Sequence, residues 1–191
     1  MRARLGGTGA RVRGTAGFGL WNDPGGSRRK RLALPRAIWF FYASPPSNIA
    51  LDSLVPGYGW KAMTFDAARL RLALLAPFAP LALLLMQVRW LRQALWPIGQ
   101  WALGVREALV PGDASQWHTY RIEWLPGRAR FSVDDVLLLD TPLAPRGPLG
   151  LVLWIDNQYA IVTPRGQLGG GLLAAPGTQW LDLMEVTVSV G

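Results

Sequence analysis

The chain has no cysteine and a single histidine, His118. Without thiols, the sequence excludes a disulfide framework, a thiolate metal site and a cysteine nucleophile. One histidine also excludes a metal site built from several histidines, and a Ser-His-Asp triad would have to use His118. Because His118 falls within a regular strand pattern, we expect it to be packed in a sheet with its hydrogen bonds satisfied.

Acidic side chains are also few, and the glutamates are limited to Glu107, Glu123 and Glu185. Asp182 and Glu185 are three positions apart on a predicted strand, so they lie on opposite faces and cannot form a catalytic pair with each other. The glycines at 169–171 are not followed by Lys-Ser or Lys-Thr and do not form a phosphate-binding loop. The few acidic residues and the missing phosphate-binding motif therefore leave few catalytic mechanisms open to this chain.

Positive charge is concentrated in the first part of the chain. Up to Arg36 there are nine Lys and Arg residues and one acidic residue, Asp23, so this part carries the whole net charge of +8. The basic run at 28–31 follows the turn-forming sequence DPGGS and is interpreted as a solvated loop. No basic stripe interleaved with aromatic residues accompanies it, so nucleic acid is not an expected partner. No apolar segment follows the first charges, so we expect no signal peptide in this chain, and the compartment stays open.

An apolar stretch from Leu72 to Met86 is the main hydrophobic run. It is shorter than the roughly 20 residues that span a bilayer, and it contains prolines at 77 and 80. Asp66 has the character of a helix N-cap, and apolar residues continue at helical spacing to Val105. We therefore expect a helical, strongly apolar insertion over 66–113.

Three interpretations of this insertion are open. Arg89, Trp90, Arg92, Trp96 and Trp101 are of the types that settle at a membrane interface, which favours attachment to a membrane surface. A helical lid packed across one sheet is the preferred interpretation, in which the same tryptophans would be core residues or would roof a ligand cleft. A transmembrane helix is the least favoured interpretation, because the run is short and interrupted by proline.

The rest of the chain predicts antiparallel β-structure. From Trp117 the sequence WHTYRIEW alternates between two faces, and a Pro-Gly turn at 126–127 leads into a second alternating strand. Short strands at regular spacing predict a single sandwich domain over 1–191. The predicted strands lie within 10–21, 37–43, 61–65, 117–124, 129–133, 136–140, 149–155 and 179–190.

The hairpin at 117–135 resembles a pattern of glycoside hydrolase family 16 and its concanavalin A-like relatives, W-H-T-Y-x-I-E-W followed by x-F-x-V-D-G. The segments GFGLW at 17–21, 35–43 and 180–188 are weaker matches in a compatible order, so the resemblance covers about two thirds of the chain. It implies a concanavalin A-like β-sandwich (jelly roll) carrying the helical insertion.

Two departures from the family pattern change what the resemblance implies. The catalytic signature E-x-D-x-x-E is absent, and the strand at 37–43 contains no acid, whereas a retaining mechanism needs two carboxylates about 5 Å apart. Members also place strands before the segment that 10–21 resembles. A sandwich that lacks an edge strand exposes unpaired backbone groups, so either residues 2–8 cover that edge or the start of the sequence is misplaced. We expect the second, and therefore a sandwich without the usual catalytic residues and with an N-terminally truncated sequence, which would be extracellular or membrane-associated if complete.

Two clusters of similar composition are the candidate ligand site. An aromatic ring can cover the apolar face of a sugar while neighbouring Asp and Asn bind its hydroxyl groups. Ordinary turn chemistry is the alternative explanation of the same residues. The candidate carbohydrate-binding residues are Trp21, Asn22, Asp23, Trp39, Trp154, Asp156, Asn157 and Tyr159.

The leading functional hypothesis is a carbohydrate- or glycolipid-binding domain. The alternatives are a divergent glycoside hydrolase acting on a polysaccharide through Asp23 and Asp156, and a membrane-associated structural protein in which the sandwich is a scaffold. No cofactor or metal is implied, although Asp and Asn oxygens are the ligand type that Ca²⁺ takes.

Overall fold

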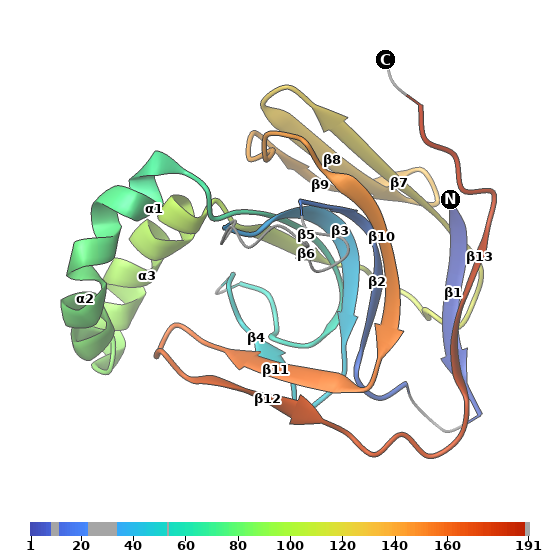
Figure 1. Cartoon of the computed structure of the whole chain (residues 1–191), viewed down its shortest axis with the longest axis horizontal. Coiled ribbons are helices and arrows are strands. Elements are labelled where there is room, and N and C mark those ends of the chain that lie inside the picture. The colour runs from blue at the N-terminus through green and yellow to red at the C-terminus, as the bar shows by residue number, and fades with distance from the viewer. Residues whose placement is uncertain (9–11, 23–33, 53, 190–191) are drawn as a thin grey trace.

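Two antiparallel sheets face each other in the computed structural model, which describes residues 1–8, 12–22, 34–52 and 54–189 (Figure 1). We call them the central sheet and the back sheet. The central sheet consists, in spatial order, of β10 (Gly150–Asp156), β2 (Thr15–Trp21), β3 (Arg36–Ala43), β5 (Gly59–Asp66) and β6 (Arg106–Leu109). The back sheet consists of β13 (Gln179–Met184), β1 (Arg2–Gly7), β7 (His118–Leu125), β8 (Arg128–Val133) and β9 (Val136–Thr141).

The main hydrophobic core lies between these sheets, because alternate residues of each strand point inward. Phe18 of β2 and Phe40 of β3 meet Tyr120 of the back sheet, with ring centroids 5.1 and 4.9 Å from that of Tyr120. Phe131 of β8 packs edge-on against Phe40 at 5.5 Å. Burial in this core raises the pKa of Tyr120 to about 12. The mainly-β sandwich expected from the period-two pattern is confirmed.

A small third sheet lies to one side of the central sheet. It consists of β12 (Leu168–Leu172), β11 (Gln158–Val162) and β4 (Asn48–Ile49), with β4 parallel to β11. In Figure 1 the hairpin of β11 and β12 reaches from the end of β10 toward the helices. The small sheet therefore borders the face of the central sheet that points away from the core.

The helical insertion is confirmed between β5 and β6. It comprises α1 (Leu70–Leu75), the 3₁₀ turn η1 (Ala76–Phe78), α2 (Ala79–Leu85) and α3 (Arg89–Leu103). A second, smaller hydrophobic cluster joins α3 to the central sheet, where Trp96 and Leu103 pack around Met63 of β5 and Val105. α1, η1 and α2 have no buried residue.

Both ends of the insertion differ from the sequence prediction. Asp66 is not the N-cap of α1, because its backbone extends β5 opposite Arg36, while its carboxylate accepts a hydrogen bond from Ala68 N and pairs with Arg69 at 3.3 Å. Residues 106–109 form the edge strand β6, since pairing with β5 supplies their backbone hydrogen bonds. Arg2–Gly7, the less favoured candidate for covering an open sheet edge, forms strand β1 between β13 and β7.

Candidate functional site

The outer face of the central sheet, which points away from the core, carries a group of aromatic rings. We define this aromatic face as Trp21, Trp39, Phe41 and Trp154. The Trp39 ring is its centre, with centroid distances of 6.1 Å to Trp21, 6.2 Å to Phe41 and 5.2 Å to Trp154. Phe41 and Trp154 are also stacked, 6.1 Å apart. Three of the predicted binding residues, Trp21, Trp39 and Trp154, are thus brought together.

Glycines in β2 make room for these rings. Gly17 is paired with both Trp154 of β10 and Phe41 of β3, and a Cβ at Gly17 would overlap the Trp154 indole and Phe40 O. With Gly17 in place, the indole lies flat over β2 and its Nε1 donates to Thr15 Oγ1 at 3.1 Å. The spacing of glycines that predicted a close approach in this strand is therefore explained by an aromatic side chain.

Two indole N–H groups of the aromatic face are unsatisfied. Among the residues that the structure describes, Trp21 Nε1 and Trp39 Nε1 are buried and have no hydrogen-bond partner. Trp96 Nε1 of α3, beside the smaller hydrophobic cluster, is in the same state. A buried N–H without a partner is unfavourable by about 1–3 kcal/mol. Because these N–H groups are enclosed, their missing partners are a local cost of packing the rings together.

A buried ion pair lies next to the aromatic face. Lys61 of β5 is paired in register with Phe41, and its Nζ lies 2.9 Å from Glu107 Oε2 of β6. Lys61 Nζ also donates to Ile49 O at 3.0 Å, while Glu107 Oε1 has no partner among the described residues. Burial raises the pKa of Glu107 to about 7, against the opposing attraction of Lys61, and the charge of Asp52 raises it further.

Sequence analysis did not select Lys61 or Glu107. The available signal was a lone lysine at an outer-face position of an otherwise apolar strand, in the sequence GWKAMTF. A buried ammonium group requires a counter-charge, but 46 positions separate it from Glu107. The identity of that partner could not be derived without the pairing of β5 with β6.

The predicted polar residues are engaged with nearby backbone. Asp156 Oδ1 accepts hydrogen bonds from Thr15 N, Thr15 Oγ1 and Gln158 N. Asn157 Nδ2 donates to Leu173 O, which ties the base of the β11–β12 hairpin. Asn22 accepts from Arg36 N and donates to Leu34 O. Only the bond from Gln158 N to Asp156 is a local turn contact; the other bonds join segments that are at least 12 positions apart in the sequence.

The two predicted clusters are not adjacent. Asp156 pairs with Thr15 at one end of β2, and Trp21 lies at the other end. Six residue steps of about 3.4 Å each separate the two ends by roughly 20 Å. Tyr159 lies on β11, where its ring is 2.9 Å from a Cβ built at Gly171. Asp23, the other candidate carboxylate, lies outside the described residues.

His118 is held in the back sheet as expected. Its Nδ1 lies 2.6 Å from Asp134 Oδ2, and its Nε2 lies 3.1 Å from Asp113 O. The hydrogen bond to Asp134 raises the pKa of His118, and burial opposes it. Both ring nitrogens are thus occupied. Within the described part of the chain, no group of three or more His, Asp or Glu side chains is placed to hold a metal ion.

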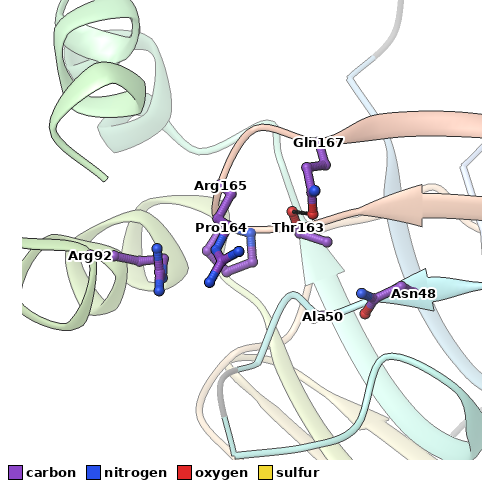
Figure 2. A pocket seen from close by; sticks show the side chains of 7 residues that line it. All are labelled: Asn48, Ala50, Arg92, Thr163, Pro164, Arg165 and Gln167. Atoms are coloured by element: carbon purple, nitrogen blue, oxygen red, sulfur yellow. Dashed lines mark hydrogen bonds between the residues drawn. The ribbon is translucent and has the colours of Figure 1, made fainter. Parts of the chain in front are cut away.

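None of the four residues of the aromatic face lines either of two cavities found in the described part of the chain. One of about 280 Å³ lies between α3, β4 and the β11–β12 loop; Figure 2 shows Arg92 projecting toward Arg165 there. A larger groove of about 1760 Å³ opens between the two large sheets, lined by Leu20, Tyr120 and Leu151 among others. None of the described candidate binding residues lines this groove. In the described residues, no helix combines the length and apolar character needed to cross a membrane.

No protein-family profile, curated protein or solved structure matches this chain. The resemblance to glycoside hydrolase family 16 therefore stands on the sequence of the β7–β8 hairpin and its weaker companions. The architecture itself is established: the chain forms a mainly-β sandwich with two large antiparallel sheets and a helical insertion.

Proposed function

We propose that the outer face of the central sheet binds a carbohydrate, as a glucanase-like domain of the concanavalin A type. The observation that carries the proposal is the aromatic face itself, in which Trp39 contacts Trp21, Phe41 and Trp154. Aromatic rings pack against the apolar C–H faces of pyranose sugars, and indole N–H groups donate to oxygen atoms. Three indole rings and one phenyl ring are gathered on this face.

The charges beside the aromatic face support binding in preference to hydrolysis. Hydrolysis of a glycosidic bond requires two carboxyl groups that reach the bond from opposite sides. Glu107 has a pKa suited to proton transfer near neutral pH, but its side chain is enclosed and paired with Lys61. Asp156 Oδ1 is engaged by three hydrogen-bond donors. The function proposed is therefore recognition of a sugar, or of a glycolipid headgroup, without its cleavage.

Affinity electrophoresis in gels that contain individual polysaccharides tests the proposal. The wild-type chain is expected to be retarded by at least one polysaccharide. Trp39→Ala should lower the affinity calculated from that retardation about tenfold, and Trp39→Phe should lower it less. Trp117→Ala is the matched control, because Trp117 stacks on Arg4 at 4.9 Å near the edge of the back sheet. Equal retardation of both alanine variants, or none for the wild type across the panel, would contradict the proposal.

A hydrolase is the competing function, and the same panel distinguishes it. Release of reducing ends by the wild type that is lost in Asp156→Asn would replace binding by catalysis. Retention in the gel without release of reducing ends is the result that we expect.

A further inference from the structure

The helical insertion exposes an unusual amount of apolar surface. Soluble proteins usually bury large aliphatic and aromatic side chains, and they expose such residues singly rather than in groups. The insertion exposes eleven of them. These exposed side chains are Leu70, Leu74, Phe78, Leu81, Leu83, Leu84, Leu85, Val88, Trp90, Ile98 and Trp101.

The exposure is concentrated where α2 turns into α3. We define the helical corner as residues 83–92 together with the loop that joins β11 to β12. Gln87 Nε2 ties the two parts by donating to Arg165 O at 2.8 Å and to Leu83 O at 3.0 Å. Leu83 also lies 3.0 Å from a Cβ built at Gly166, and Leu168 follows, 79% exposed. The apolar residues of the helices and of the loop therefore belong to one region.

The charges of the helical corner have one sign. Residues 67–106 contain no Asp or Glu. Arg92 Nη1 donates to Met86 O at 3.0 Å, and neither Arg92 nor Arg165 forms an ion pair within the described residues. Both line the cavity of about 280 Å³, together with the polar side chains of Asn48, Thr163 and Gln167 (Figure 2).

We propose that the helical corner lies on an anionic lipid surface, with its leucines and Trp90 in the boundary between headgroups and acyl chains and with the cavity at Arg92 and Arg165 accepting a lipid phosphate. Apolar burial and attraction of basic residues to anionic lipid are together the two contributions that stable interfacial binding requires. A guanidinium group matches the geometry of phosphate oxygens. A second copy of this chain is disfavoured as the occupant, because it would bring arginines against arginines.

Co-sedimentation of the full chain with lipid vesicles tests this proposal. The affinity of the chain for vesicles of phosphatidylcholine with added phosphatidylglycerol is expected to be at least about tenfold higher than its affinity for vesicles of phosphatidylcholine alone. Raising the salt concentration from about 0.1 M to about 1 M shortens the screening length from about 10 Å to about 3 Å and is expected to reduce that difference.

Two pairs of variants separate the apolar and the charged contributions. Leu84→Ser with Trp90→Ser is expected to weaken vesicle binding about tenfold or more. The control pair, Val136→Ser with Leu137→Ser on β9, should leave vesicle binding unchanged. Both pairs should fold, because each side chain is more than half exposed: Leu84 by 68%, Trp90 by 66%, Val136 by 62% and Leu137 by 53%.

Arg92→Gln with Arg165→Gln, which removes both arginines that line the cavity, is expected to abolish most of the preference for phosphatidylglycerol. Arg121→Gln with Arg146→Gln, which removes the same charge elsewhere, should retain it.

Three results would overturn the proposal. The first is equal loss of binding in the corner variants and in their controls. The second is a thermal shift produced by inorganic phosphate without any vesicle binding, which would make the cavity a site for a soluble anion. The third is a dimer in light scattering that is dissociated by the Leu84 and Trp90 substitutions, again without vesicle binding. None of these outcomes depends on carbohydrate binding by the aromatic face.

Discussion

Lys61 Nζ lies 2.9 Å from Glu107 Oε2, and neither side chain is exposed to solvent. The pair joins β5 to β6, the strands that precede and follow the helical insertion, and the bond from Lys61 Nζ to Ile49 O ties β4 to the same point. One ammonium group thus connects three strands. Removal of either charge leaves the other buried without compensation.

Replacing Lys61 by methionine is expected to destabilise the protein in a pH-dependent way. At about pH 8 the free energy of unfolding should fall by about 3–5 kcal/mol, because Glu107 loses its counter-charge. Burial raises the pKa of Glu107 from 4.5 to about 7, so its titration favours folding at low pH, and that contribution is lost as the pH rises through about 7. The loss in Lys61→Met should therefore be smaller at about pH 5, as measured by urea denaturation.

The double variant Lys61→Met with Glu107→Leu is the control for this experiment. Because it removes both charges, its free energy of unfolding should exceed that of Lys61→Met at about pH 8 and should depend less on pH. A loss in Lys61→Met that is the same at both pH values would show that the charge on Glu107 does not matter.

The single histidine offers a direct measurement of a pKa. The ring signal of His118 in an NMR titration needs no assignment by mutation, and its pKa should lie above 6.5 because Nδ1 is hydrogen-bonded to Asp134. Asp134→Asn should lower that pKa. A pKa of His118 that is unchanged in Asp134→Asn would contradict the hydrogen bond.

The same pair predicts a window of stability. The raised pKa of His118 contributes stability that is complete below about 6.5 and is lost as the pH rises through its folded pKa. The pKa of Asp134 is lowered from 3.8, mainly by the bond from Thr119 N and then by His118, so its contribution is lost as the pH falls through that lowered pKa. The melting temperatures of Asp134→Asn and the wild type should therefore differ most at pH values between the lowered pKa of Asp134 and the raised pKa of His118.

The turn between β8 and β9 contains two residues with left-handed backbone, Asp134 at φ 49° and Asp135 at φ 63°. Glycine is preferred at the second position of such a turn. Asp135→Gly is therefore expected to raise the free energy of unfolding by about 0.5–1 kcal/mol in urea denaturation. Asp134→Gly should lower it, because the Asp134 carboxylate holds Thr119 N and His118.

Substitution at Gly17 tests the packing of the aromatic face. A Cβ there would displace the Trp154 indole, so Gly17→Ala should cost about 1–3 kcal/mol and weaken binding of any sugar that uses Trp154. Gly169→Ala on β12 is the matched control, because its Cβ would meet Ile161 at an ordinary 3.7 Å. Thermal denaturation followed by tryptophan fluorescence measures both. Equal stability of the two variants would show that both the Trp154 indole and the backbone at Phe40 can shift to admit a methyl group.

Local patterns predicted the strands that have strong periodicity. The hairpin of β7 and β8 follows from alternation and from Pro126-Gly127, and β3 follows from an aromatic run between prolines. β1 and β12 did not follow, because their sequences RARLGG and LGGGL resemble loops. They become strands only because partners elsewhere in the chain supply their hydrogen bonds. Strands that depend on pairing with distant parts of the chain could therefore not be predicted from their own sequences.

The candidate site was predicted in part for the same reason. Composition singled out Trp21, Trp39 and Trp154, and the register of β10, β2 and β3 brings their rings together. Asn22, Asn157 and Asp156 instead bond mainly to other segments of the chain, at sequence separations from 12 to 141 positions. Nothing in the neighbourhood of Lys61 along the chain indicates Glu107, since only the pairing of β5 with β6 makes them neighbours.

The pairing of β1 with β13 has a consequence for the newly made chain. Arg2 is opposite Met184, and Arg4 forms an ion pair with Asp182 at 2.8 Å. At a synthesis rate of roughly 5–20 residues per second, β1 waits on the order of 10–35 s before β13 is made. During that time Ala3 and Leu5, which are buried in the finished sheet, have no complete surface to pack against. The backbone hydrogen bonds of β1 on its β13 side can therefore form only when almost the whole chain has been made.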